Sequence, residues 1–581
     1  MLRRFLLPGL LFLVASLPIQ AAETALDAIS TDASLVIRLK NPKATIAKVA
    51  DLADVVVPNS GDSIRNHPSK LGDMISNPTL AGVNMESDWW VAVYATGGEQ
   101  EPDVVFIIPA SDLKAMKEAL GNDVKFTEYG KFGVYTTDAD AATKTAARIK
   151  GEGKSIHTLA DKDSSALFEG GDVSVFINVP QLAAAYKTDI DEFKDNVNEK
   201  IENAPQGLPG GSFDPQQMSE IVQKVLGFLT QGLSDTQSCT VAATISKEGL
   251  NFEDLVKLKA GTPTDKLLAR SAPSPLANLS ALPSGYLGYF GLSWDMSDFT
   301  KLSEWLLGAG ATGVKPEAAK TVESTLKEMA KLKFGSIATA FGLGDMDEGA
   351  VRSVTMTEVD NPTKMRELTL KTMKAMGTVE NQGIKQTFTV KPDAEKYGKN
   401  SADVVSVKTE FNEADNPFVA ALMGRVNAAM FGPDGMTTRV VYLKDRVVQT
   451  LGGGKQAMND VLASLDKKPA DTAKSPAQQT RGKLGAKSNL LVLWDIPGTV
   501  AKIAAIVVES QTVPIPVDPD AIKELQSKPS YTGLSAATEP QGLRVKTVVP
   551  VEQMQAVAKI VKFLQEAGLG GGQAEEDTEE N

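Results

Sequence analysis

The stretch Asn489–Val507, NLLVLWDIPGTVAKIAAIV, contains the pattern from which most of the fold can be predicted. An apolar run of strand length ends at Trp494, and a run rich in Ala, Ile and Val follows it. Between the two runs, Asp495 can cap a helix and Pro497 suits the first helical turn. The stretch therefore predicts a strand, a tight corner and a helix.

The same order of strand, corner and helix recurs in three other stretches, Ser34–Leu52, Ser174–Tyr186 and Tyr286–Gly308. Hairpins recur as well, since Ala-Ala-Thr, a turn and then Gly-Leu occur in both Ala242–Leu250 and Ala536–Leu543. Paired segments that keep their order predict a tandem duplication with a repeat of about 250 residues, the size of a domain. We expect an α+β fold with two tandem, internally duplicated domains, each an antiparallel-rich sheet with helices packed on one face.

The chain of 581 residues is too long for one core, and its composition suggests boundaries. Arg3 and Arg4 precede the apolar run Phe5–Leu17, which predicts a secretory signal peptide; an uncleaved N-terminal anchor is the alternative. The expected parts are a signal peptide at residues 1–22, a first repeat domain at 23–270, a Pro- and Ser-rich linker at 271–283, a second repeat domain at 284–566 and a disordered acidic tail at 567–581. The protein is expected to be exported to the periplasm or outside the cell.

The formal net charge of −13 makes nucleic acid an unexpected partner, because an acidic surface repels phosphate backbones. Cys239 is the only cysteine, which excludes an internal disulfide, and its strand-like surroundings favour a buried thiol over a reactive one. After the signal, Leu490–Val508 is the most apolar stretch, but Asp495 and Lys502 interrupt it. No transmembrane segment is therefore expected once the signal is removed.

No motif predicts catalysis. The two histidines, His67 and His157, lie in polar segments without a nucleophile elbow nearby. One cysteine and two histidines do not match a zinc motif, so neither a metal nor a cofactor is expected. Gly452–Lys455 is only superficially similar to a phosphate-binding loop, because Gln456 stands where that loop needs Ser or Thr. We interpret these glycines as a corner between a strand and a helix.

The best candidates for a binding surface are Trp89 and Trp90. They are adjacent in the strand-like run Trp89–Ala95, so their side chains point to opposite faces of a sheet. One of the two rings is therefore expected on an exposed or ligand-facing side.

The dipeptides Trp294-Asp295 and Trp494-Asp495 suggest a pair of catalytic carboxylates. The matching corners of two other units carry Asn41 and Asn178. Asn replaces Asp as a helix cap but not as a catalytic acid, so helix capping is the favoured interpretation.

The corner units and the Ala-Ala-Thr…Gly-Leu hairpins resemble large exported bacterial proteins that form a domain-of-unknown-function family. The resemblance implies an envelope or secreted location and transfers no catalytic residue. We expect a non-catalytic extracytoplasmic protein that binds an apolar ligand or an envelope partner in a groove between the domains. The alternatives are a hydrolase whose carboxylates meet only in the fold, and a structural component of the envelope.

Overall fold

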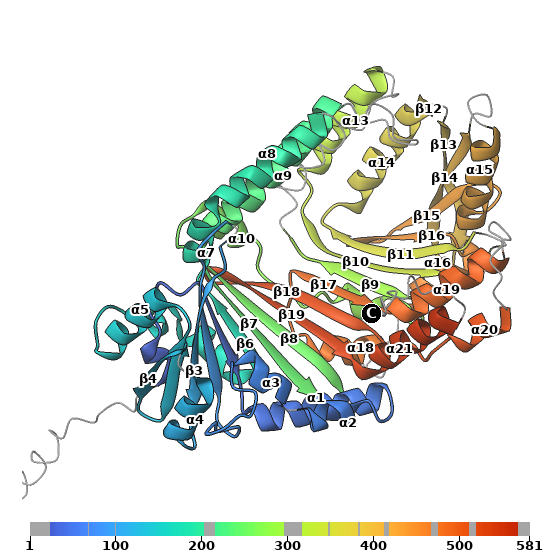
Figure 1. Ribbon diagram of the computed structural model, residues 1–581. Helices are drawn as coiled ribbons and strands as arrows, with labels where there is room; N and C mark the ends of the chain where they lie inside the picture. Colours follow the sequence, from blue (N-terminus) through green and yellow to red (C-terminus); the bar gives the residue numbers. More distant parts are fainter. Residues whose placement is uncertain are drawn as a thin grey trace, which may run out of the picture.

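The computed structural model describes the chain except for residues 1–23, 68, 99, 122, 203–214, 295–315, 345, 347–348, 382–383, 412–416, 466–474, 510–518 and 567–581. The expected signal peptide and acidic tail therefore lie outside the described residues. The rest is an α+β fold built on a large antiparallel sheet (Figure 1). Among the described residues, every helix is too short or too polar to span a membrane.

The nineteen strands that the structure describes form one antiparallel sheet. The strands of the first half lie side by side in the order β4 (Lys125–Tyr129), β5 (Phe132–Thr136), β3 (Asp103–Pro109), β2 (Trp89–Tyr94), β1 (Leu35–Leu39), β6 (Val173–Ile177), β7 (Thr236–Ser246) and β8 (Gly249–Leu258). The hairpin β7–β8 confirms the one expected at Ala242–Leu250, and β4–β5 forms a second hairpin. Strand β8 then pairs with β19, so the sheet continues into the second half.

From β19 outward, the strands of the second half follow in the order β19 (Gly542–Pro550), β18 (Thr532–Glu539), β17 (Leu490–Trp494), β9 (Gly288–Leu292), β10 (Phe334–Leu343), β11 (Val351–Val359), β16 (Arg446–Leu451), β15 (Met436–Tyr442), β14 (Asn400–Phe411), β13 (Ile384–Tyr397) and β12 (Thr378–Asn381). Strands β12 to β14 have no counterpart among the described strands of the first half. When β12 to β14 are left out, each half has eight described strands. If the strands of each half are numbered by their order in the chain, both halves show the same spatial order outward from the β8–β19 pair.

Three of the four expected strand–corner–helix units are confirmed. They are β1 with α1 (Pro42–Val56), β6 with α7 (Val179–Ala185) and β17 with α19 (Ile496–Glu509). The fourth unit is confirmed only for its strand, β9, because its expected helix lies among residues 295–315, outside the described part of the chain.

One face of the sheet, which we call the covered face, packs under helices. In the first half, Val36 and Phe176 on this face pack with α5 (Ala139–Ile149) and α6 (Lys162–Gly170). In the second half, Val354 and Leu491 on the same face pack with α11 (Asn278–Ala281), α16 (Gly454–Leu465) and α18 (Pro476–Lys483). Burial of these apolar side chains stabilises the fold by about 1.5–3 kcal/mol for each large residue.

The opposite face is covered by described helices at its two ends. Helix α4 (Leu113–Leu120) packs over Ile108 and Tyr135 of the first half. Helix α14 (Pro362–Met376) packs over Val440 and Val447 of the second half. The expectation that helices pack on one face only is therefore wrong at both ends of the sheet. Over the strands between these ends, most side chains of this face stay partly exposed. The exceptions include Ile245 of β7, which is buried against Leu52 of α1 and Val551.

The segment 271–283, expected as a linker, contains α11 and contributes Leu276, Leu279 and Leu282 to the core of the second half. The stretch between α7 and β7 contains α8 (Lys187–Glu202) and α9 (Pro215–Asp235). In Figure 1, these two helices and α13 (Pro316–Met329) extend along one side of the molecule, away from the central strands. In the second half, the stretch between α14 and β15 contains β12 to β14 and α15 (Pro417–Phe431).

Candidate binding surfaces

The pairing of β8 with β19 joins the two halves and gives the centre of the sheet two chemically different faces. Side chains alternate between the faces along each strand. Glu253, Arg544 and Lys546 point to the covered face, whereas Asp254 and Val545 point to the opposite face.

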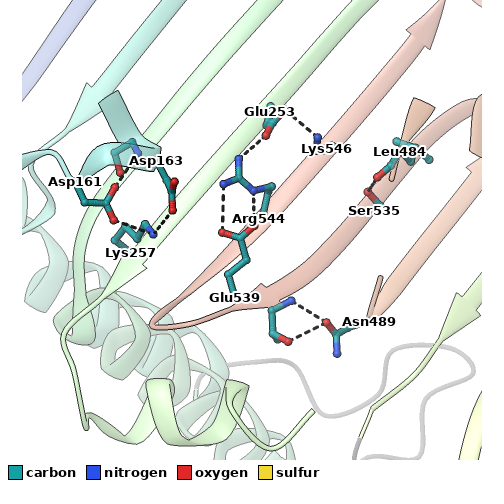
Figure 2. Close-up of polar contacts among 12 residues, drawn as sticks. Asp161, Asp163, Glu253, Lys257, Leu484, Asn489, Ser535, Glu539, Arg544 and Lys546 are labelled. Carbon is teal, nitrogen blue, oxygen red and sulfur yellow. Dashed lines mark hydrogen bonds and ion pairs between the residues drawn. The ribbon is translucent and has the colours of Figure 1, made fainter. Parts of the chain in front are cut away.

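On the covered face, the junction carries a polar seam of charged residues, namely Glu253, Lys257, Glu539, Arg544 and Lys546 (Figure 2). The Arg544 guanidinium contacts both Glu253 and Glu539, with Nη2 lying 3.2 Å from Glu539 Oε2. Lys546 stands directly opposite Glu253 in the strand register, with Nζ 3.1 Å from Oε2. Hydrogen bonds to the Glu539 and Glu253 carboxylates raise the pKa of Arg544.

A cavity of about 480 Å³ lies over the polar seam. The acidic side chains that line it, Asp163 and Glu253, are both ion-paired, Asp163 to Lys257 at 3.8 Å and Glu253 to Arg544 and Lys546. A hydrolase of the carboxylate type needs two acids that face one another and are not both neutralised. The seam does not supply such a pair, and we interpret it as a set of electrostatic contacts between β8 and β19.

The opposite face of the central strands, which we call the central open face, is apolar. One row of side chains in direct register crosses it from strand to strand: Ile37, Val175, Val241, Asp254, Val545, Ala536, Leu490 and Leu292. Each of them is partly exposed. Neighbouring strands lie about 4.8 Å apart, so this row of eight strands is about 34 Å long.

Further rows beside this one extend the apolar surface. One of them includes Phe252, Leu534, Val492 and Phe290, all partly exposed. At the rim, Trp494 is 43% exposed and packs edge-to-face on Phe341, with ring centroids 6.0 Å apart. An antiparallel sheet that faces water normally carries polar residues there. A contiguous apolar surface of this size is typical of binding sites.

Asp254 is the one charged residue of the row, and it lies at the junction of the halves. Its register neighbours are Val241 on β7 and Val545 on β19. Partial burial among apolar side chains raises the pKa of Asp254, and the nearby Glu253 raises it further. The thiol of Cys239 lies on the same face, and burial raises its pKa to about 11. Such a thiol is largely un-ionised at neutral pH, as the sequence predicted.

The structure places Trp89 and Trp90 on opposite faces of β2, as expected for adjacent strand residues. Trp89 is 3% exposed, and its Nε1 donates to the carbonyl of Asn84. Trp90 is partly buried and packs edge-to-face on Phe132, with centroids 5.7 Å apart. Both rings serve packing in the core of the first half. A binding role for either ring stays a prediction that this packing does not favour.

Helix capping is confirmed at two of the corners. Asp495 Oδ1 accepts from Gly498 N at 3.0 Å, and Asn41 Oδ1 accepts from Ala44 N at 3.0 Å. At Asn178 the expectation is wrong, because its amide donates to the carbonyls of Thr31 and Ala33 and makes no cap bond. Asp295 lies outside the described residues, so the suggested pairing of Asp295 with Asp495 is not described either.

The remaining candidates occupy ordinary structural positions. His67 and His157 are exposed, and the two are not brought together with a nucleophile in the part of the chain that the structure describes. Gly452 to Gly454 lead from β16 into α16, which confirms a corner between a strand and a helix. Within the described ranges, no group of three or more His, Cys, Asp or Glu residues is arranged to hold a metal ion.

No protein-family model matches the chain, and no curated protein or solved structure matches it either. The central open face could not be predicted from the sequence. A signal for it is present in strands such as LLVLW (Leu490–Trp494), where apolar residues fill both alternating sets of positions. Such runs are usual for strands buried on both faces, so the pattern does not reveal that one face remains open.

Proposed function

We propose that the protein is a non-catalytic, extracytoplasmic binding protein that holds an apolar ligand against the central open face. The observation that carries this proposal is the row of partly exposed apolar side chains that continues in register across the junction of the two halves. Desolvating such a surface with an apolar ligand gains about 25 cal/mol for each Å² of apolar area buried.

The location outside the cytoplasm rests on the N-terminal sequence, with Arg3 and Arg4 before an apolar run and small residues after it. The absence of a catalytic role rests on the chemistry of the described residues. The polar seam is ion-paired, and the exposed histidines stand in no catalytic arrangement. Binding is therefore the function that the arrangement supports best.

We also infer that the two halves arose by tandem duplication of one α+β unit and form two similar domains. The matching strand order of the halves supports this inference. In this account β8 and β19 are equivalent strands that pair with each other across a pseudo-twofold axis. An antiparallel pair of equivalent strands is the arrangement expected in a symmetric dimer, so the unit is inferred to have paired through its edge strand before the genes fused.

The test of the proposed function uses a neutral fluorophore, N-phenyl-1-naphthylamine, whose emission rises in apolar surroundings. Two variants of the same strand provide a matched pair. Val241→Asn places an amide on the central open face, and Thr244→Asn places one on the covered face. We expect the wild type and Thr244→Asn to bind the fluorophore with affinities within about twofold, and Val241→Asn to bind it several-fold more weakly, because the polar amide must lose water.

Circular dichroism and the urea midpoint would show that both variants keep the fold. A wild-type protein that leaves the emission unchanged would contradict the proposed function. Equal loss of binding in both variants would show that the fluorophore does not occupy the central open face.

A further inference from the structure

The position of Asp254 restricts the kind of apolar ligand that the central open face can hold. In the strand register its neighbours are Val241 and Val545, and along β8 its neighbours on the same face are Phe252 and Val256. None of these side chains can donate a hydrogen bond or neutralise a carboxylate. Among the described residues, Asp254 has no hydrogen-bond or ion-pair partner for its side chain.

The other charges at the junction do not serve Asp254. Glu253, Arg544 and Lys546 lie on the covered face and pair with one another. In the register rows from β1 to β9, the other positions on the face of Asp254 are apolar side chains or neutral Thr and Cys. A carboxylate that is partly desolvated in apolar surroundings is unfavourable unless a cation accompanies it.

The surroundings also decide which kind of cation fits. Ca²⁺ takes six to eight oxygen ligands, and Mg²⁺ needs an octahedral set. A single carboxylate between valines offers neither. An alkylammonium group needs one carboxylate for a charge-assisted hydrogen bond, and an aromatic ring such as Phe252 can add a cation–π contact. Its hydrocarbon part would lie on the apolar row.

We propose that Asp254 is the headgroup site of the central open face and that the ligand is a cationic amphiphile, with an ammonium group at Asp254 and its hydrocarbon chain along the row on either side. This inference rests on the proposed function, because it names the ligand class of the same surface. The row extends to both sides of Asp254, over β7, β6 and β1 in one direction and over β19, β18, β17 and β9 in the other. A chain can therefore leave the headgroup site in either direction.

The test compares three probes with the same ten-carbon chain: decylammonium, 1-decanol and decanoate. Affinities are measured by displacement of N-phenyl-1-naphthylamine at neutral pH, below the concentrations at which the probes form micelles. For the wild type we expect decylammonium to bind at least about tenfold more tightly than decanol, and decanoate to bind more weakly than decanol.

Asp254→Asn removes the charge with little change in shape and should bring the affinity for decylammonium down to that for decanol. Glu253→Gln is the matched control, because the adjacent residue points to the covered face, and it should keep the tenfold preference. Asp254→Ser is a second variant with the same expectation as Asp254→Asn, in case the amide disturbs the fold.

Equal affinities of the wild type for decylammonium and decanol would overturn the headgroup site while leaving the apolar surface in place. If none of the three probes displaces the fluorophore and the fluorophore itself does not bind, the proposed function fails as well. Carbodiimide coupling of Asp254 to a lysine of the same chain, detected by peptide mass spectrometry, would also overturn the inference, since the carboxylate would then have an internal partner.

Discussion

Replacement of Asp495 separates the role of its charge from its role as a helix cap. Asp495 is 4% exposed, and its Oδ1 accepts from Gly498 N at 3.0 Å and from Gln553 Nε2 at 3.1 Å. Burial raises the pKa of Asp495, so the site accepts a neutral group well. Asn keeps an acceptor in the same place, and we expect Asp495→Asn to change the free energy of unfolding by less than about 0.5 kcal/mol.

Asp495→Ala removes the acceptor. A lost cap costs about 0.5–2 kcal/mol, and the upper end applies here because water cannot easily reach Gly498 N at a buried corner. The loss of the Gln553 hydrogen bond to Asp495 costs less than the loss of the cap, since Gln553 Nε2 still donates to the Ser530 carbonyl at 2.6 Å. We therefore expect Asp495→Ala to lower the free energy of unfolding by about 2 kcal/mol.

Urea unfolding followed by tryptophan fluorescence measures both variants, and Trp494 next to the substituted position makes the signal sensitive to this corner. Asp112→Ala is the control, because Asp112 caps α4 at an exposed site through Lys114 N and Ala115 N. Its loss should cost about 1 kcal/mol or less, since water replaces the side chain. Equal destabilisation by Asp495→Asn and Asp495→Ala would refute the capping argument and show that the charge itself matters.

Three further predictions concern the junction. Arg544→Met should lower the free energy of unfolding in urea by about 1–3 kcal/mol, because Glu539 loses its cation. Adding Glu539→Gln should restore part of this loss. A double variant that shows no recovery would contradict the ion-pair interpretation. Asp254→Asn should stabilise the protein at neutral pH, since the folded state raises the pKa of Asp254 and so disfavours its charge. This gain should shrink as the pH falls through the raised pKa toward 3.8, where wild-type Asp254 becomes protonated in both states, and a gain that does not depend on pH would contradict the argument. Alkylation of Cys239 by iodoacetamide should be slow at pH 7 and accelerate as the pH rises toward about 11, and a bound decyl probe should slow it further; fast alkylation at pH 7 would show that the thiol is not in apolar surroundings.

Local structure could be predicted well from the sequence because the signals are local. The alternation in CTVAATIS and LNFEDLVKLK and the turn between them predict β7 and β8 whatever surrounds them. The corner at Asp495 and Pro497 likewise needs only the geometry of a helix start.

Long-range pairing could not be predicted in the same way. The register of β8 against β19 joins residues almost three hundred positions apart, such as Glu253 and Arg544. The sequence also does not show that the described helices leave most of the centre of one face partly exposed, because Val241 and Val545 would have the same pattern in a fully buried strand. In the sequence, Asp254 is simply the second of two adjacent acids. Only the pairing of β8 with β7 and β19 shows that its neighbours on the same face are apolar.

The proposed function requires an apolar ligand to lie on the central open face, across the junction of the two halves. Photo-crosslinking with a neutral alkyl diazirine, followed by peptide mass spectrometry, tests it most directly. We expect labelled positions on β7, β8, β19 and β18 at residues that point to the open face, such as Val241, Phe252 and Val545. Labelling at covered-face positions such as Thr244 and Lys546, or spread evenly over exposed helices, would contradict the account.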